Sequence, residues 1–290
     1  MARIALPARL KQTASEPVAP TLVIEPARGL VHLRLGELIE FRELLYFLVW
    51  RDLKVRYKQT VLGVSWALLQ PVLTALIFAL FLGHLVGVRS QGVPYLLFAL
   101  TALVLWTLFA QSVAVGGQSV VAISNVVTKV YFPRALVPLA TVMALTVDFL
   151  IGVAILVPAV LLYGRGLDAR ALLAPLFVLL ALTSALGVSL WLSALNVRYR
   201  DFRYVIPFVV QVGLFVSPVA YPSSLLHGAA RIAYAINPLA GAIDGFRWTL
   251  LGTPAPALAP LGVSVAAAIV LLVGGLYYFR RLEATIADFI

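Results

Sequence analysis

Long runs of apolar residues, separated by short polar and charged segments, follow one another from residue 63 to residue 279. A helix needs about 20 such residues to cross the hydrocarbon core of a bilayer, and most of the runs reach this length. The fifth run is short and lies between Pro207 and Pro218. The pattern predicts six membrane-spanning helices, at about residues 63–86, 95–115, 137–163, 171–195, 205–221 and 258–279.

The segment between the fifth and sixth runs differs from the others, because Pro, Gly and polar residues interrupt it repeatedly. It is too broken to cross a bilayer as one helix and too apolar to form a solvated loop. We expect a pair of short re-entrant or interfacial helices there. The predicted fold class is an all-α integral membrane domain over residues 36–290, preceded by a mobile cytoplasmic tail over residues 1–35.

Just before the first run, residues 41–58 concentrate aromatic and basic side chains. Wound as a helix at about 100° per residue, they place Tyr46, Trp50 and Tyr57 on one side, with a basic stripe beside them. Such a helix lies in the membrane interface, although a simple positive anchor for the first span would need only part of this pattern. We expect an interface helix over residues 37–60, whose candidate lipid-headgroup contacts are Trp50, Arg51, Lys54, Arg56 and Lys58.

Gln70 and Pro71 lie inside the first apolar run. A proline within a helix removes one backbone hydrogen bond and kinks the helix. The backbone groups that it frees are tolerated at that depth where they face protein or a water-filled cavity. We therefore expect the first span to bend at Pro71.

Composition excludes several other classes of protein. Hydrophobic residues make up 62% of the 290 residues and charged residues 12%, and the mean hydropathy is +1.01, which together indicate an integral membrane protein. The net charge of +10 does not indicate nucleic-acid binding, because the basic residues lie at span borders and form no stripe interleaved with aromatics elsewhere. The absence of cysteine excludes disulfides, thiolate metal sites and cysteine nucleophiles.

The distribution of lysine and arginine predicts the orientation of the chain. With the N-terminus in the cytoplasm, twelve of these residues near span ends fall on the cytoplasmic side and five on the opposite side. Cytoplasmic loops retain an excess of positive charge. We therefore expect both termini to be cytoplasmic, which agrees with an even number of spans.

The segment between the second and third spans, residues 124–140, combines two prolines with aromatic and basic residues. Lys129 and Arg134 lie on either side of the adjacent pair Tyr131 and Phe132. An ordinary loop seldom holds apolar aromatics between two cations near its centre. We expect a short surface helix that offers Tyr131 and Phe132 to a groove of a partner protein.

Asp148 lies near the middle of the third span, where an ionisable residue is costly unless it faces the bundle interior or a cavity. Both a functional role and a structural hydrogen bond are consistent with this position. The three histidines show no spacing for a metal site, so we assign none. No phosphate-binding loop, nucleophile elbow or HExxH motif occurs in the chain, so it carries no recognisable catalytic machinery.

Aromatic residues lie inside or at the rim of several spans. An aromatic face can hold the apolar side of a sugar ring, whereas each residue taken singly also fits a lipid-facing or belt position. With Asp148, the candidates for lining a channel are Trp66, Phe78, Trp106, Phe109 and Tyr221.

Several segments, in this order, carry a resemblance to a known family. They are RDLKVRYKQTVLGVSWALLQP, NVVTKVYFPRALVP, NVRYRDFRYVIP, SPVAYP, INPL followed by Arg247, and the terminal FRRLEATIADFI. From about Glu37 to its end, the chain resembles the permease subunit of ABC type-two exporters. It is most similar to the branch that exports lipid-linked polysaccharides such as O-antigen, capsule or teichoic acid.

The resemblance implies a homodimer in the bacterial cytoplasmic membrane, with two copies of a separate ABC ATPase that binds ATP and Mg, and no cofactor in this chain. It also implies six spans with both termini cytoplasmic, the interface helix, a coupling helix between spans two and three, and re-entrant gate helices between spans five and six. The residues expected to couple to the ATPase are Lys129, Tyr131, Phe132, Pro133 and Arg134.

Other functions remain open at this stage. An ABC exporter of another amphiphile, such as a glycolipid or a drug, fits the same segments. An ion-coupled secondary transporter or channel would use Asp148 as its coupling site and would need no ATPase. A membrane-embedded glycan-processing enzyme would need polar catalytic residues clustered at one membrane border, and the sequence offers only isolated ones, so we expect a transporter permease.

Overall fold

The computed structural model describes residues 40–58, 63–127, 132–164, 166 and 168–283. The chain divides into Met1–His32, which lies outside the described residues, and Leu33–Ile290, to which everything below refers. Within the described residues all regular structure is helical. Four helical segments are long and apolar enough to cross a membrane, namely Tyr95–Gly116, Leu136–Leu162, Ala169–Arg198 and Leu258–Glu283. The first and fifth predicted spans correspond to shorter apolar helices, Leu69–Leu85 and Phe202–Val216.

The helices follow the apolar runs closely. Helix α2 (Arg42–Tyr57) precedes α3 (Gly63–Phe78), which continues as the π-helical segment η1 (Ala79–Leu85). Pro71 lies inside α3, which is not interrupted there. The remaining elements are α4 (Tyr95–Gly116), α5 (Ser119–Ala122), α6 (Ser124–Val127), α7 (Leu136–Leu162), η2 (Ala169–Leu173), α8 (Ala174–Arg198), α9 (Phe202–Val216), η3 (Ser223–Leu225), α10 (Gly228–Tyr234), α11 (Pro238–Leu251) and α12 (Leu258–Glu283).

The fifth apolar run forms a shorter helix than its hydropathy predicts. Helix α9 ends at Val216, whereas we expected the helix to continue to residue 221. Ser217 has an extended backbone with φ −96° and ψ 153°, because the residue before a proline is disfavoured in the helical conformation and Pro218 follows. The last apolar residues of the run therefore form a turn that returns to the bundle.

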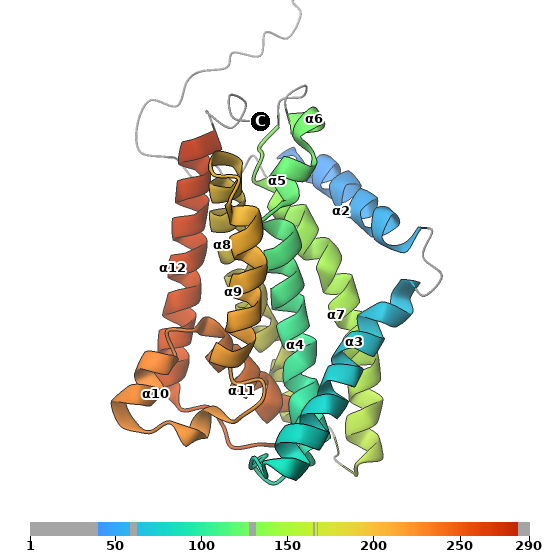
Figure 1. Ribbon diagram of the computed structural model, residues 1–290, viewed down its shortest axis with the longest axis vertical. Helices are drawn as coiled ribbons and strands as arrows, with labels where there is room; N and C mark the ends of the chain where they lie inside the picture. Colours follow the sequence, from blue (N-terminus) through green and yellow to red (C-terminus); the bar gives the residue numbers. More distant parts are fainter. Residues whose placement is uncertain (1–39, 59–62, 128–131, 165, 167, 284–290) are drawn as a thin grey trace, which may run out of the picture. The chain divides into compact units, whose positions relative to one another are not determined.

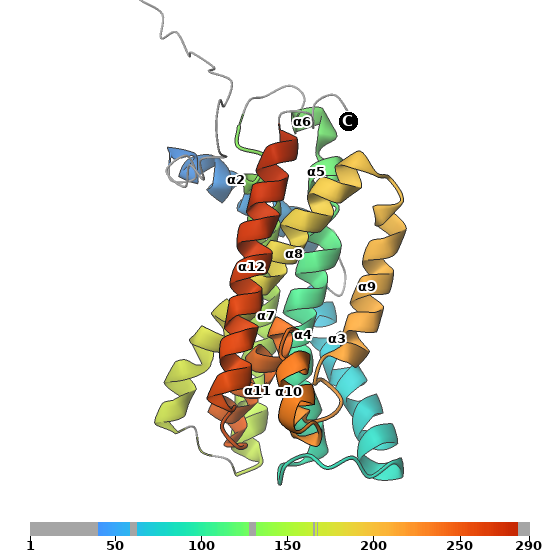
Figure 2. The ribbon, with the colours of Figure 1, turned by 90° about the vertical axis from the view of Figure 1, so that its left-hand side faces the viewer.

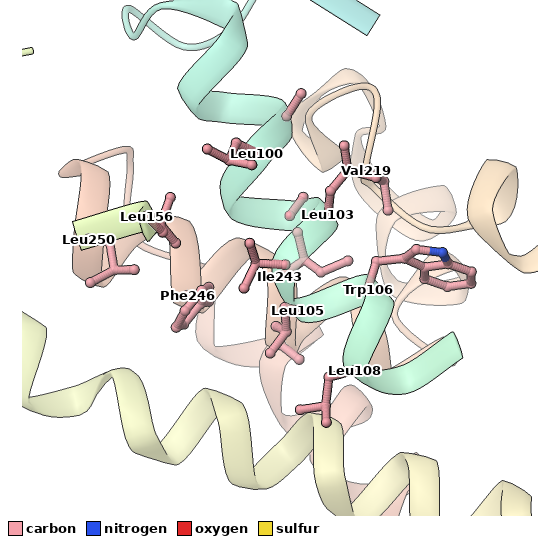
Figure 3. Close-up of a cluster of buried hydrophobic side chains, with 14 of the residues drawn as sticks. Leu100, Leu103, Leu105, Trp106, Leu108, Leu156, Val219, Ile243, Phe246 and Leu250 are labelled. Carbon is pink, nitrogen blue, oxygen red and sulfur yellow. The ribbon is translucent and has the colours of Figure 1, made fainter. Parts of the chain in front are cut away.

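Helix α4 lies at the centre of the helical bundle (Figure 1) and packs against α3, α7, α8, α9 and α11. In its most apolar stretch 78% of α4 is buried, against 17% for α12, so α4 is central and α12 peripheral. Figure 3 shows the core around it, where α4 residues meet side chains of α7 and α11. The labelled members are Leu100, Leu103, Leu105, Trp106, Leu108, Leu156, Val219, Ile243, Phe246 and Leu250.

A second core cluster joins the elements at the other end of the bundle. It includes Phe132 and buried residues of α2, α5, α7, α8 and α12, among them Leu48, Val120, Leu136, Leu190 and Phe279. Helices α2, α5 and α6 lie at the same end as the last turns of α12, and α10 lies at the opposite end (Figure 1, Figure 2). The segments with the predicted cytoplasmic charge thus meet at one end of the bundle.

The two short helices expected between the fifth and sixth runs are present as α10 and α11. Most of α11 is buried, and it packs against α4, α8 and α12. Asn237 starts α11 as its N-cap, because its side-chain oxygen accepts a hydrogen bond from the Leu239 backbone N–H at 3.1 Å. Arg247, 1% exposed, donates from Nη1 to the Pro218 carbonyl at 2.6 Å and from Nη2 to the Val219 carbonyl at 2.7 Å. It thereby holds the turn after α9 against α11.

Candidate functional site

Helix α2 has two unlike faces. Leu48 is buried in the cluster that contains Phe132. On the outer side Tyr46, Phe47 and Trp50 are 63%, 64% and 47% exposed, and the Lys54 ammonium lies 5.3 Å from the centroid of the Trp50 ring. Exposed rings beside cations are typical of a helix that lies in a membrane interface. The position of α2 in a membrane interface stays a prediction.

Polar contacts attach the second half of α2 to α7. The Thr141 hydroxyl donates to Oδ2 of Asp52 at 3.2 Å. Four residues further along α2, Arg56 Nη1 lies 2.7 Å from Oδ2 of Asp148, and the Tyr57 hydroxyl donates to Oδ1 of the same carboxylate. Residues four apart on one helix and seven apart on another lie on one face of each, which explains why these contacts occur together.

Asp148 is thus compensated by groups from the interface helix. Its side chain is 16% exposed and that of Arg56 is 31% exposed, so the ion pair is only partly shielded from solvent. Burial, and then the hydrogen bond to Asp148, raises the pKa of Tyr57 above its ordinary value. The hydroxyl of Tyr57 therefore keeps its proton and remains a donor to the carboxylate.

Beside this ion pair the chain forms a partly open cavity of about 230 Å³. Its walls come from the end of α2 and from α3, α4 and α7. The apolar lining residues are Trp66, Pro71, Val104, Leu108, Leu145 and Phe149. The polar lining residues are Arg56, Tyr57, Gln70, Thr107, Gln111 and Asp148. A mostly apolar pocket with a few convergent polar groups is the usual form of a small-ligand site.

Three of the polar lining residues are available to a ligand. The side chains of Gln70, Thr107 and Gln111 form no hydrogen bond with the part of the chain that the structure describes. Each brings a hydrogen-bond donor and an acceptor to the cavity. Arg56 is the one cation among the described lining residues. The cavity can therefore bind a polar, anionic headgroup while Trp66 offers an apolar face.

The interface-helix candidates divide into two groups. Arg56 lies in the cavity, whereas Trp50, Lys54 and Lys58 are exposed on α2. Arg51 Nη2 lies 2.7 Å from Oδ1 of the neighbouring Asp52, and both side chains are partly exposed. Contact of these residues with lipid headgroups stays a prediction.

The structure places the described coupling residues differently from the surface position that we expected for them. Lys129 and Tyr131 lie outside the described residues. Phe132 is 4% exposed and packs in the cluster with Leu48, so the expectation that its ring is offered to a partner's groove is wrong for this structure. The physical reason is that its ring completes a core between α2, α5 and α12, which removes apolar area from solvent.

The neighbouring residues Pro133 and Arg134 join the loop to the end of α12. Pro133 is buried, and its carbonyl accepts a hydrogen bond from the Leu136 backbone N–H at 3.0 Å. The Arg134 backbone N–H donates to Oε1 of Glu283, and Arg134 Nη1 donates to the Glu283 carbonyl, both at 2.6 Å. Arg134 therefore has a defined partner within the chain, which the sequence did not indicate.

Most of the channel-lining candidates lie away from the cavity. Trp66, 56% exposed, lines it together with Asp148. Trp106 is 5% exposed and packs closely against Gly213 of α9, which contradicts the expectation that its ring faces a channel. Tyr221 donates its hydroxyl proton to the Phe215 carbonyl at 2.8 Å. Phe78 and Phe109 are partly buried against the main core.

A second cavity, of about 390 Å³, lies between the helices α5 and α6 and the turn from α8 to α9. Arg200 and Arg203 line it together with Gln118, Ser124 and Asn196. Both arginines are exposed, so this hollow has a basic edge. The helices α5 and α6, which contribute to its lining, are at the end of the bundle that carries α2 and the last turns of α12 (Figure 2).

Sequence reasoning missed the polar lining of the first cavity. Thr107 and Gln111 lie four residues apart in α4, so they share a face of that helix. Two polar residues at that spacing in an otherwise apolar span were the available signal. Gln70 was noticed only as the neighbour of Pro71, and its part in the cavity follows from the packing of α3 beside α4.

Comparison with known proteins decides the family. A family model described as ABC-2 type transporter matches residues 43–251, which is more than half of the chain. The chain belongs to the ABC-2 type transporter family. The match confirms the resemblance seen in the sequence, and membership of the ABC-2 family implies an ABC ATPase as partner.

Curated relatives within the ABC-2 family carry a common name. The O-antigen export system permease protein RfbA of Myxococcus xanthus is 29% identical over 238 residues, covering 81% of this chain and 91% of the relative. Two proteins of the same name from Klebsiella pneumoniae are similar. One is 30% identical over 206 residues, covering 71% of this chain and 79% of the relative. The other is 29% identical over 247 residues, covering 85% of this chain and 94% of the relative.

Proposed function

We propose that this chain is the membrane subunit of an ATP-driven exporter that moves a lipid-linked polysaccharide of the O-antigen type across the bacterial cytoplasmic membrane. The observation that carries the proposal is that the matched relatives, over most of their length, are all named as O-antigen export permeases. The cavity beside Arg56 adds support, because it combines a cation and free hydrogen-bonding groups with an aromatic ring.

In the proposed assembly two copies of the chain enclose the export path, each crossing the membrane six times with both termini cytoplasmic. The helices α10 and α11 act as re-entrant gate helices on the outer side. The end of the bundle that carries α2, α5 and α6 faces the cytoplasm. The basic residues Arg51, Lys54 and Lys58 contact the ATPase or the phosphate groups of lipid.

Two ATPase subunits, which bind ATP and Mg, supply the energy in this proposal. The 290 residues contain no phosphate-binding loop of their own. The segment of residues 124–134 and the basic-edged cavity beside Arg200 form the proposed contact with the ATPase. Because Phe132 is buried against α2, a push on this segment would also move the interface helix.

The experiment is a deletion of the gene with complementation from a plasmid. We expect the deletion strain to lose surface polysaccharide, detected with an antibody, and to accumulate the lipid-linked polymer in the cytoplasm. The complemented strain is the control for expression. Unchanged surface polysaccharide in the deletion strain would contradict the proposal.

Reconstitution separates this function from an ion-coupled transporter. The chain purified with its ATPase into vesicles should move the lipid-linked polymer only with ATP and Mg present. An ATPase variant without its catalytic glutamate is the matched control and should show no transport. Transport driven by an ion gradient without ATP would favour the secondary-transporter alternative, with Asp148 as its coupling residue.

A further inference from the structure

We propose that the ion pair of Arg56 and Asp148 is a latch that a lipid-linked phosphate opens. A phosphate or pyrophosphate group on a lipid carrier enters the cavity, binds Arg56 in place of Asp148, and so loosens the attachment of the second half of α2 to α7. The inference rests on the proposed export function, since it concerns the substrate of the same site. It adds the group that is recognised and the movement that recognition starts.

The first argument is the position of Arg56. Its guanidinium is the one cation among the described residues that line the cavity, and its Nη1 is already 2.7 Å from Asp148. Guanidinium binds carboxylate and phosphate with the same planar fork of donors, so the two anions compete for it. A pyrophosphate carries more negative charge than one carboxylate. It therefore displaces Asp148 when it reaches the cavity.

The second argument is that the Asp148 carboxylate keeps a hydrogen-bond donor when Arg56 leaves it. The Tyr57 hydroxyl also donates to Asp148, and this bond does not depend on Arg56. When Arg56 turns to a phosphate, the carboxylate keeps a donor inside the protein. Removing one partner of a shielded ion pair is otherwise strongly unfavourable. Tyr57 thus lowers the free-energy cost of opening the latch.

The third argument concerns what the latch holds. The first half of α2 is fixed by apolar packing around Leu48, whereas the second half makes polar contacts with Thr141 and Asp148. The bond to Thr141 joins a hydroxyl and a carboxylate at 3.2 Å. The ion pair is therefore the stronger attachment. Its loss leaves the hydrogen bonds of Tyr57 and Asp52 as the described polar contacts there. It thereby loosens the part of α2 that precedes α3, the helix that supplies Trp66 and Gln70 to the cavity wall.

The size of the cavity identifies which part of the substrate is recognised. Its volume of about 230 Å³ is below the range of about 300–1,000 Å³ of ordinary small-ligand pockets. A phosphate headgroup fits within this volume, whereas a whole polysaccharide is far larger. Gln70, Thr107 and Gln111 supply further donors around it. The recognised chemistry is therefore the phosphate end of an amphiphile, and the polymer stays outside.

The test measures the separation of α2 and α7 in the complete complex with the ATPase, reconstituted in phosphatidylcholine nanodiscs. Because the chain contains no cysteine, spin labels can be attached at Val55→Cys and Met143→Cys alone. Val55 on α2 is 75% exposed and Met143 on α7 is 44% exposed, so neither label disturbs the core. Pulsed electron paramagnetic resonance then gives the distance distribution between the labels.

Four additions distinguish the sources of phosphate. They are an isoprenoid pyrophosphate, the corresponding isoprenoid alcohol, inorganic pyrophosphate, and phosphatidylglycerol mixed into the bilayer. We expect the isoprenoid pyrophosphate to lengthen and broaden the distance distribution and the other three to leave it unchanged. An equal response to inorganic pyrophosphate or to phosphatidylglycerol would overturn the assignment to a carrier-linked phosphate.

Variants of the latch give the decisive comparison. Asp148→Asn removes the competitor of the phosphate, so the distribution should be broad without ligand, and the ligand concentration at half response should fall by at least about fivefold. Arg56→Gln should abolish the response. Arg42→Gln removes an exposed cation from the same helix and should respond as the unaltered chain does. If Asp148→Asn does not fold, two other variants still test the latch. Asp148→Glu retains the ion pair and should respond to the lipid, whereas Arg56→Gln should not.

Failure of the latch and failure of the proposed function give different results. If the isoprenoid pyrophosphate stimulates ATP hydrolysis by the complex but leaves the distance between the labels unchanged, the latch is wrong and the export function stands. If the complex neither responds to the lipid nor moves the polymer, and the deletion strain keeps its surface polysaccharide, the proposed function is wrong.

Discussion

The guanidinium of Arg247 lies over the ring of Phe98, with its central carbon 3.4 Å from the ring centroid. Its Nε also donates to the Phe98 carbonyl at 3.0 Å, so one buried cation covers both the ring and the backbone of a single residue of α4. The other nitrogens bind the carbonyls of Pro218 and Val219. Arg247 therefore connects α11, α4 and the turn after α9, and satisfies three carbonyls at their junction.

Replacement of this residue should destabilise the protein strongly. Arg247→Ala leaves three carbonyl groups without their donor and removes the contact with the Phe98 ring. Hydrogen bonds to charged groups contribute about 1.5–3 kcal/mol each, so we expect a loss of at least about 3 kcal/mol. The measurement is the thermal unfolding midpoint in detergent. Arg89→Ala, which removes an exposed arginine, is the control and should change the midpoint little.

The buried position of Phe132 leads to a second prediction. Phe132→Ala should cost about 3–5 kcal/mol, because it opens a cavity in the cluster that joins α2 to α5, α8 and α12. Phe132→Leu keeps most of the apolar volume and should cost less than about 1.5 kcal/mol. Unfolding by a chemical denaturant distinguishes the two variants. Equal stability of the alanine variant and the unaltered protein would show that this ring lies at the surface.

The contact between the loop and α12 can be tested through the protection of backbone amides. Glu283 accepts from the Arg134 backbone N–H and lies 3.0 Å from Arg280. Glu283→Ala removes both contacts and should cost about 1–2 kcal/mol locally, which makes hydrogen exchange in the last turn of α12 roughly 5- to 30-fold faster. Glu43→Ala, at an exposed position of α2, should leave that exchange unchanged.

The helices of the bundle could be predicted well because length and hydropathy determine them. Helices α4, α7 and α12 begin or end within a few residues of the predicted spans. The exception, α9, stops at Val216 because backbone conformation before Pro218 overrides hydropathy. Pro71, in contrast, does not end its helix, because α3 continues through it. A proline in the sequence thus marks a place of possible interruption, and the neighbouring packing decides the outcome.

The candidate site was less accessible from the sequence. Asp148 and Arg56 were each recognised, but as members of different groups, because 92 residues separate them and nothing local indicates their pairing. The sequence favours a surface position for Phe132 because Lys129 and Arg134 lie on either side of the aromatic pair. Its burial depends on α2, which packs on the same cluster from a distant part of the chain. Such contacts depend on the angles at which helices cross. The periodicity of apolar residues within one helix gives no information about these angles.

Two glycines in α12 allow a matched test of the close backbone contact between α8 and α12. A Cβ on Gly275 would lie 2.6 Å from the carbonyl oxygen of Gly187 on α8, where backbone must shift to make room, whereas nothing lies within 4 Å of a Cβ on Gly262. Gly275→Ala should therefore destabilise the protein by about 1–3 kcal/mol, as overpacking does. Gly262→Ala should be neutral or stabilise by up to about 1 kcal/mol, because alanine favours the helix. Thermal unfolding of both variants checks this, and equal midpoints would show that α8 and α12 are further apart than the structure has them.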